Sequence, residues 1–351
     1  MPDAAPLVWW QELGAKAAIA LVVFGANFLT FVNMTWVERR VLAFMQFRLG
    51  PNRVGPFGLL QPWADAIKLL FKEEVMPAAA SKGAYLAAPV VAITAAFMAL
   101  AVIPYGPPFP LFGRMWQIQV ADLGVGILYI FAITSLGVYG VVMAGWSANN
   151  KWGLLGSLRS SAQMFSYELS LGLSWVGLIL TAGSFRINDI IANQAGWFWN
   201  WNVFMQPLAF LVYFIAACAE VARTPFDLPE GESELVAGFH TEYSSMSFGL
   251  MQIAEYVNMI TVSVLAANLF LGGWNSGIPG LPSEAPWGFV WFFAKVGLVL
   301  FVFIWLRGTL PRFRYDQLMH FGWKVLIPMA VLSIVVTAAK EVVFPRVSVF
   351  R

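Results

Sequence analysis

The stretch MFSYELSLGLSWVGLIL, residues 164–180, is apolar enough to cross a bilayer, yet it carries a glutamate, Glu168. Three other long apolar stretches also contain an ionisable residue that is predicted to lie inside the membrane. They are YFIAACAEVARTPF (213–226), GLMQIAEYVNMITVSVL (249–265) and WGFVWFFAKVGLVLFVFIW (287–305), with Glu220, Glu255 and Lys295. A charge at the centre of a bilayer costs roughly 2.5–3.5 kcal/mol on insertion scales. A chain that keeps several such residues is predicted to carry ions or protons through a membrane.

The composition supports an integral membrane protein. Hydrophobic residues make up 59% of the chain and charged residues 11%, whereas soluble domains have about 25% charged residues. The single cysteine, Cys218, excludes an internal disulfide and any cysteine-rich iron–sulfur site. Two histidines, His240 and His320, weigh against a multi-histidine metal or haem site, so we expect this chain to bind no metal.

The apolar runs predict an all-α, polytopic membrane domain that spans residues 1–351. A spanning helix needs about 20 apolar residues, and eight runs reach that length. They lie near residues 15–37, 84–104, 121–146, 161–183, 203–222, 246–271, 287–307 and 323–343. Eight spans place both termini on one side of the membrane.

The positive charges indicate which side that is. Of the 21 lysines and arginines, 14 lie in or beside the connections opposite the termini, and 6 lie on the side of the termini. Because cytoplasmic loops carry the excess of positive charge, we expect the termini outside and the basic loops in the cytoplasm. For a bacterial protein this places the chain in the inner membrane, with its termini in the periplasm.

Two of the predicted cytoplasmic loops are long. The first, residues 39–83, contains GPFGLLQPWADAIKLLFKEE, whose apolar residues recur at helical spacing and predict an amphipathic helix on the membrane surface. The second, residues 223–246, is the most acidic segment of the chain. Apolar residues of the loop, such as Phe226, Leu228 and Leu235, are interleaved with its acids, so part of the loop is expected to be buried. The four central acids are Asp227, Glu230, Glu232 and Glu234.

Each of these features also has a simpler explanation. In this explanation, the arginines at the end of the first span only fix the orientation of the helix in the membrane, and the acidic loop is simply exposed to solvent. The acids inside the spans could be structural charge pairs, with Lys295 neutralising one glutamate. One lysine cannot neutralise three glutamates, however, so a proton path explains the set better. Glu220 is expected within a turn of the cytoplasmic end of its span, and no role is assigned to His240 or His320.

Long segments of the sequence resemble a known family. WVERRVLAFMQFRLGPNRVGPFGLLQPWADAIKLLFKE (36–73) and AEVARTPFDLPEGESELVAGFHTEYS (219–244) are similar to the two signature segments of the H subunit of respiratory complex I. This is the NuoH, or mitochondrial NADH dehydrogenase subunit 1, family. PRFRYDQLMHFGWK (311–324) looks like a third family segment, and the resemblance covers essentially the whole chain.

The resemblance implies a membrane subunit of a proton-pumping NADH:quinone oxidoreductase that is not catalytic in isolation. It implies a quinone cavity shared with peripheral subunits on the cytoplasmic side, beside adjacent subunits of the membrane arm. FMN and iron–sulfur clusters would belong to partner subunits. The matching cavity residues are Trp36, Arg39, Gln46, Arg48, Asp65, Phe226 and Arg307. The matching acidic path comprises Glu168, Glu220, Asp227, Glu230, Glu232, Glu234 and Glu255, to which Lys295 is added here for its intramembrane charge.

Two other functions remain as alternatives. The first is the related subunit of a membrane-bound hydrogenase or a ferredoxin-linked complex, although GESELVAGFHTEYS is more similar to the quinone enzymes. The second is an autonomous secondary transporter, for which inverted repeats and a broken-helix site at the midplane would be expected.

Overall fold

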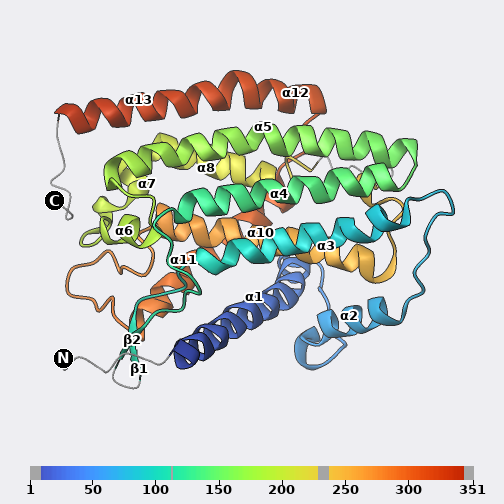
Figure 1. Ribbon diagram of the computed structural model, residues 1–351, viewed down its shortest axis with the longest axis horizontal. Helices are drawn as coiled ribbons and strands as arrows, with labels where there is room; N and C mark the ends of the chain where they lie inside the picture. Colours follow the sequence, from blue (N-terminus) through green and yellow to red (C-terminus); the bar gives the residue numbers. More distant parts are fainter. Residues whose placement is uncertain (1–8, 112–113, 228–236, 344–351) are drawn as a thin grey trace.

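The computed structural model describes residues 9–111, 114–227 and 237–343, and these form a bundle of long, roughly parallel helices (Figure 1). The long helices are α1 (Trp9–Met45), α3 (Lys82–Ala99), α4 (Gly126–Ser147), α5 (Lys151–Ala182), α10 (Ser245–Leu269), α11 (Trp287–Thr309) and α13 (Ile327–Val343). The shorter ones are α2 (Gln61–Phe71), α6 (Ile187–Ala192), α7 (Asn202–Met205), α8 (Pro207–Glu220) and α12 (Tyr315–Phe321). A small hairpin, β1 (Phe109–Leu111) and β2 (Arg114–Trp116), lies at one end, with Phe109 opposite Trp116. The all-α membrane fold is therefore confirmed.

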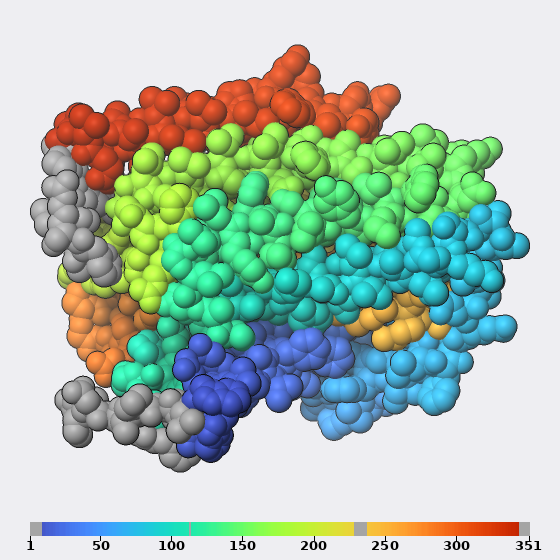
Figure 2. Space-filling view, in the orientation of Figure 1, coloured from blue at the N-terminus to red at the C-terminus, as the bar shows by residue number. Residues whose placement is uncertain are grey.

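Helix α10 forms the centre of the bundle. In its apolar stretch 72% of the residues are buried, against 22% in α1. It contacts α1, α2, α3, α6 and α11. The space-filling view shows the first part of α10 between α2 and α3, while α13 forms a ridge along the opposite edge (Figure 2).

The outer faces of the bundle are apolar, as a surface in contact with lipid requires. Large exposed hydrophobic side chains line the outer helices. They include Leu21, Val22, Phe24 and Leu29 of α1, Phe293, Leu298, Phe301 and Trp305 of α11, and Val331, Leu332, Val335 and Val336 of α13.

Seven helical segments in the described part of the chain are long and apolar enough to span a bilayer, where the sequence predicted eight. Several of them are longer than predicted: α1 continues past Arg39 to Met45, α5 begins at Lys151, and α12 and α13 join through a π-helical turn, Gly322–Leu326. The predicted span that is missing from this set is the fifth, 203–222, which is divided at Gln206 because Pro207 cannot continue the preceding helix. This leaves α7 and the 14-residue α8.

Helix α8 ends inside the bundle. Gln163 lies 12 residues after the first residue of α5, or roughly 18 Å along the helix, and its Nε2 donates to the carbonyls of Ala219 (2.8 Å) and Phe226 (2.7 Å). The chain after Glu220 therefore turns beside the middle of α5. Glu220 is the last residue of α8, as expected from its predicted place within a turn of the end of the span. Because α8 is too short to reach the end of the bundle, however, Glu220 lies deeper than predicted (Figure 1).

The non-helical chain after α8 is held by its own hydrogen bonds as well as by Gln163. Arg223 N donates to Cys218 O (3.2 Å), and Phe226 N donates to Arg223 O (2.8 Å). Irregular backbone at membrane depth is tolerated only where protein buries it or where it lines a cavity. Both conditions hold here, since Arg223 and Phe226 are buried and Ala222 borders a cavity.

The connection near α2 is also shaped by specific contacts. Arg40 Nη1 donates to Phe57 O (2.6 Å), which fixes the turn over residues 46–60 to the end of α1. Gly58 has φ 77°, and a Cβ there would lie 2.2 Å from Pro51 O, so only glycine fits. The predicted amphipathic helix is present as α2, with its apolar residues Trp63, Ile67 and Leu70 exposed.

Candidate functional site

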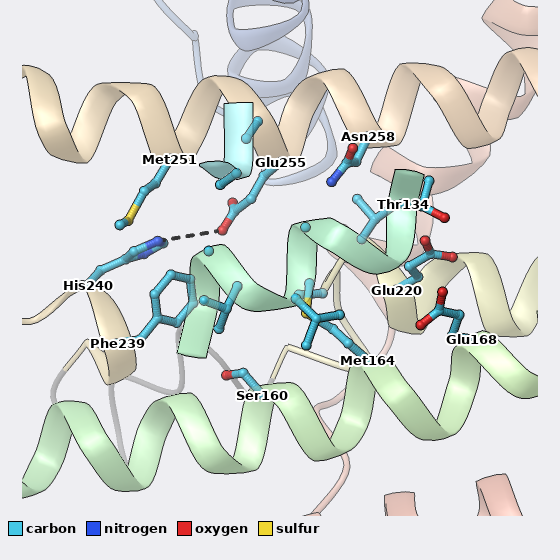
Figure 3. Close-up of a pocket in the computed structure, with 18 residues that line it drawn as sticks. Thr134, Ser160, Met164, Glu168, Glu220, Phe239, His240, Met251, Glu255 and Asn258 are labelled. Carbon is cyan, nitrogen blue, oxygen red and sulfur yellow. Dashed lines mark ion pairs between the residues drawn. The ribbon is translucent and has the colours of Figure 1, made fainter. Parts of the chain in front are cut away.

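Three of the intramembrane acids predicted from the sequence meet at one cavity. Glu168 of α5, Glu220 of α8 and Glu255 of α10 line a space of about 60 Å³, together with residues of α3, α4 and the short turn Gly238–His240. A water needs about 10–15 Å³ of such volume, so the cavity can hold a few. Figure 3 shows Glu255 in the middle and Glu168 beside Glu220 at one end. We call this space the acid cavity.

Glu168 and Glu220 form the inner end of the acid cavity. Ser135 Oγ of α4 donates a short hydrogen bond to Glu168 Oε1. Glu220 Oε2 is buried and has no hydrogen-bond partner in the described part of the chain. Two adjacent carboxylates repel each other when both are ionised, so this pair favours holding at least one proton.

His240 closes the opposite end of the acid cavity, a position that the sequence did not predict. Its imidazole is 4% exposed, and its Nε2 lies 3.9 Å from Glu255 Oε1 (Figure 3). Burial lowers the pKa of His240 to about 4, so the ring is neutral near pH 7. The contact with Glu255 is thus a polar contact rather than an established ion pair.

A second group of charges is buried beside the acid cavity. Glu38 of α1 is 3% exposed, and its Oε1 lies 3.2 Å from Arg223 Nη1 and accepts a short hydrogen bond from Arg307 of α11. The guanidinium of Arg223 also stacks on the ring of Tyr256 at 4.4 Å. We call Glu38, Arg223, Arg307 and Tyr256 the charge cluster; it ties α1, α10, α11 and the chain after α8 together.

Electrostatics keep Arg223 in the charge cluster ionised. Burial alone would lower the pKa of the Arg223 guanidinium, but the neighbouring Glu38, Tyr256 and Glu255 outweigh that effect and raise it above its usual range. Arg223 is therefore a permanent positive charge within reach of Glu255. Nearby, Asp227 is 4% exposed and is paired with Arg312 at 2.8 Å.

Glu255 borders both groups. It lines the acid cavity, and it also lines a second small pocket with Arg223, Asp227 and Arg307. It is the only acid of the described residues that borders both spaces. Among the three glutamates, Glu255 is therefore the one that links the acid cavity to Arg223 and Arg307.

An apolar cavity of about 410 Å³ lies between α1, α2 and α10. Its walls include Phe28, Trp63, Leu70, Phe248 and Ile253, and Arg39 and Asp65 sit at its polar edge. Arg39 Nη1 pairs with Asp65 Oδ2 at 2.6 Å, and Gln61 Nε2 donates to Asp65 Oδ1 at 3.0 Å. A cavity of this size and lining suits an elongated apolar molecule with a polar end.

The other residues predicted for the quinone cavity are divided among three places. Trp36 Nε1 donates to Phe57 O (3.2 Å), and Arg48 Nε donates to Gln46 Oε1 (2.7 Å) at the exposed end of α1. Phe226 is buried between Tyr167 and Phe313, at ring distances of 5.4 and 5.6 Å. Because Arg307 belongs to the charge cluster and Arg39 faces α2, the structure does not bring Arg39, Arg48 and Arg307 to a single opening.

Lys295 lies away from the acid cavity. Its Nζ donates to the carbonyls of Gly273 (2.9 Å) and Asn275 (2.6 Å) and lies 4.1 Å from the centre of the Trp201 ring. The ammonium group thus holds the loop after α10 and neutralises none of the three glutamates. Glu230, Glu232 and Glu234 lie outside the described residues.

Five participants were missed by the sequence analysis: Glu38, Arg223, Tyr256, Arg312 and His240. Glu38 and the two arginines flank apolar segments and there resemble ordinary topological charges. In the sequence His240 looks like a loop histidine, and it becomes buried only because its turn folds back between α4 and α5. The sequence held one weak signal of this burial: His240 is flanked by the aromatic residues Phe239 and Tyr243, which are both buried in the structure.

Comparisons with known proteins agree with this architecture. The model of the family described as NADH dehydrogenase matches residues 17–338. Several similar proteins carry the name of the H subunit of NADH-quinone oxidoreductase. One from Geobacter metallireducens is 54% identical over 321 residues, covering 92% of this chain and 94% of the relative. Another from Geobacter sulfurreducens is 53% identical (92% and 94% covered), and one from Koribacter versatilis is 49% identical (93% and 96% covered).

The charge cluster predicts a large stability effect for Glu38. Glu38→Gln keeps the shape but leaves Arg223 and Arg307 without their shared carboxylate, and breaking a buried pair costs about 3–5 kcal/mol. We expect a clearly lower midpoint of thermal unfolding for the purified protein. Glu12→Gln, which breaks the exposed pair with Lys16, should leave the midpoint nearly unchanged. Equal small shifts in both variants would refute the cluster's structural role.

Proposed function

The chain belongs to the NADH dehydrogenase family, whose relatives here are H subunits of NADH-quinone oxidoreductase, and from that premise we propose how it works. It forms the membrane side of the quinone cavity and passes the effect of quinone reduction into a buried acidic path. The observation that carries this proposal is the position of Glu255, which borders both the charge cluster and the acid cavity.

The apolar cavity between α1, α2 and α10 is proposed as the way in for the quinone. A quinone has a long apolar tail and two carbonyl oxygens on its ring, which match an apolar cavity with Arg39 and Asp65 at its edge. Trp36, Gln46 and Arg48 lie near the same end of α1 and would contact the ring or a partner subunit. Arg307, which belongs to the charge cluster, and Phe226 would act deeper in the bundle.

Reduction of the quinone supplies the electrical signal. Two electrons put negative charge on the quinone oxygens, and that charge must be met by protons or by positive groups. In a medium of low polarity, such a charge acts strongly on ionisable groups nearby. Arg223 and Arg307 would respond first, because they are the cations beside Glu255, and a proton would then redistribute among Glu255, Glu220 and Glu168. Asp227 and the acids Glu230, Glu232 and Glu234 would supply protons from the cytoplasmic side.

The redox cofactors are proposed to lie elsewhere in the complex. The relatives are membrane subunits of complex I, so this chain works as one part of a multisubunit enzyme. We propose that FMN and the iron–sulfur clusters belong to peripheral partners on the cytoplasmic side, which complete the quinone cavity, and that other membrane-arm subunits flank the bundle. The matched relatives favour neither a hydrogenase component nor an autonomous transporter.

The chain is a multi-pass membrane protein, and we propose the bacterial inner membrane with the termini in the periplasm. The support is the excess of basic residues at the end that holds α2. Although only seven helical segments of the described chain are long enough to span a bilayer, α1 begins and α13 ends at the opposite end of the bundle (Figure 1). In a Cys218→Ser background, Glu73→Cys should react with an impermeant thiol reagent only from the cytoplasmic side. Glu284→Cys, in the loop at the other end, should react only from the periplasmic side. The opposite pattern would reverse the orientation.

The apolar cavity can be tested by filling it. A Cβ on Gly249 would lie 3.2 Å from Leu69 Cδ1 at the wall of the cavity, so Gly249→Leu narrows the space between α2 and α10. We expect a several-fold higher KM for quinone, with NADH oxidation by an artificial acceptor unchanged. The matched control is Gly25→Leu, since nothing lies within 4 Å of a Cβ there. An unchanged KM in Gly249→Leu would remove this cavity from the quinone route.

The acidic path can be tested at Glu255. Glu255→Gln keeps the shape and much of the hydrogen bonding but cannot carry a proton. We expect assembled enzyme that has lost coupled turnover, whereas Glu255→Asp retains part of it. The measurement is proton uptake into vesicles together with the quinone reduction rate. Full proton pumping with Glu168, Glu220 and Glu255 all replaced by glutamine would leave only a structural role for these acids.

A further inference from the structure

His240 is a buried titratable side chain to which the path described above assigns no role. Nε2 has no hydrogen-bond partner in the described part of the chain, although the atom is buried and lies 3.9 Å from Glu255 Oε1. A buried polar atom without a partner costs about 1–3 kcal/mol. A neutral imidazole nitrogen can donate or accept a proton, so the position is suited to chemistry rather than to packing alone.

The ring of His240 is held rigidly in place. Phe239 and Phe248 pack against it, with ring centres 3.8 and 5.5 Å away. The turn that carries it is pressed onto α5, where a Cβ on Gly156 would lie 2.7 Å from Gly238 Cα. His240 N also donates to Ala237 O (3.1 Å), and Tyr243 N donates to His240 O (2.9 Å). Movement that closes the 3.9 Å distance must therefore come mainly from the Glu255 side chain.

We propose that His240 is the reversible proton acceptor of Glu255, and so determines when Glu255 is charged. A hydrogen bond needs an N–O distance of roughly 2.7–3.2 Å, so an approach of about 1 Å is enough. In the transfer, the Glu255 O–H bond breaks and an N–H bond forms at Nε2. The acid becomes a carboxylate and the imidazole becomes an imidazolium; the return transfer restores both. The inference rests on the proposed function of Glu255.

The surroundings explain why such a transfer is feasible in an apolar place. The pair keeps the same net charge before and after, so no lone charge is buried. The low pKa of His240, caused by burial, returns the proton to Glu255 unless the carboxylate is stabilised. Arg223 can provide that stabilisation from the second pocket. A change in the charge cluster would thus move the proton between Glu255 and His240.

The other groups that face His240 are few. Glu168 from α5, Glu220 from α8 and Glu255 from α10 are the ionisable side chains that line the cavity with it. From α3 and α4, the described lining residues are uncharged, such as Ala92 and Thr134. Any pH dependence that His240 contributes is therefore coupled to these three acids and to no lining lysine or arginine.

The test replaces His240 in the assembled complex. His240→Asn keeps a polar group but cannot hold a proton as imidazolium. General acid–base groups contribute about 10²–10⁴-fold, so we expect coupled quinone turnover to fall by about tenfold or more. We also expect the acid limb of its pH dependence to change, because burial lowers the pKa of His240 to about 4. NADH oxidation by an artificial acceptor should be unchanged. His320→Asn, at the exposed histidine of α12, is the matched control and should behave as wild type.

A double variant separates the two proposals and a purely structural effect. If His240 acts through Glu255, the double variant His240→Asn with Glu255→Gln has the same residual quinone reduction rate as Glu255→Gln alone. If the fold-losses of the two single variants multiply in the double variant, the two substitutions cause independent structural damage, and the inference is overturned. Wild-type turnover and pH profile in His240→Asn, with Glu255→Gln inactive, would overturn it too while leaving the acidic path intact. Wild-type turnover in Glu255→Gln would instead refute the path itself.

Discussion

Helix α8 ends at Glu220 in the middle of the bundle. The backbone N–H and C=O groups of the chain after it must therefore find hydrogen-bond partners there without bulk water. Gln163 binds the carbonyls of Ala219 and Phe226, and this contact fixes where the turn lies along α5. Because the turn is deep, Glu220 comes to lie beside Glu168, and Arg223 reaches Glu38. The acid cavity and the charge cluster both follow from this one unwound segment.

Glu255 then gains its importance from position rather than from burial. It stands on the central helix α10, with permanent cations on one side and two carboxyl groups on the other. A carboxyl group between such neighbours is stabilised as an anion by the first and as a neutral acid by the second. A small electrical change at the charge cluster can therefore shift a proton, which is the requirement for coupling a redox event to proton movement.

The all-helical membrane fold was predictable from composition and from runs of apolar residues, because a bilayer demands both. The sequence analysis assigned Glu168, Glu220 and Glu255 to one acidic path, but it did not predict that they line a single cavity. The depth of Glu220 was missed, since hydropathy treats residues 203–222 as one continuous span; the local sign of the break at Gln206 is Pro207, which starts a new helix. The partners of Glu38 and His240 were missed because contacts between residues far apart in the sequence leave no local pattern. Lys295 was placed with the acids on its charge alone, whereas backbone carbonyls are its partners.

The central claim is that quinone reduction changes the protonation of Glu255. Redox-triggered infrared difference spectroscopy of the assembled complex measures this directly, since a protonated carboxyl group has its own C=O stretching band. We expect reduction of the quinone to change a carboxyl band in the wild-type enzyme, and that signal to be absent in Glu255→Gln and shifted in Glu255→Asp. Identical difference spectra in the wild type and in Glu255→Gln, with quinone reduced in both, would contradict the account.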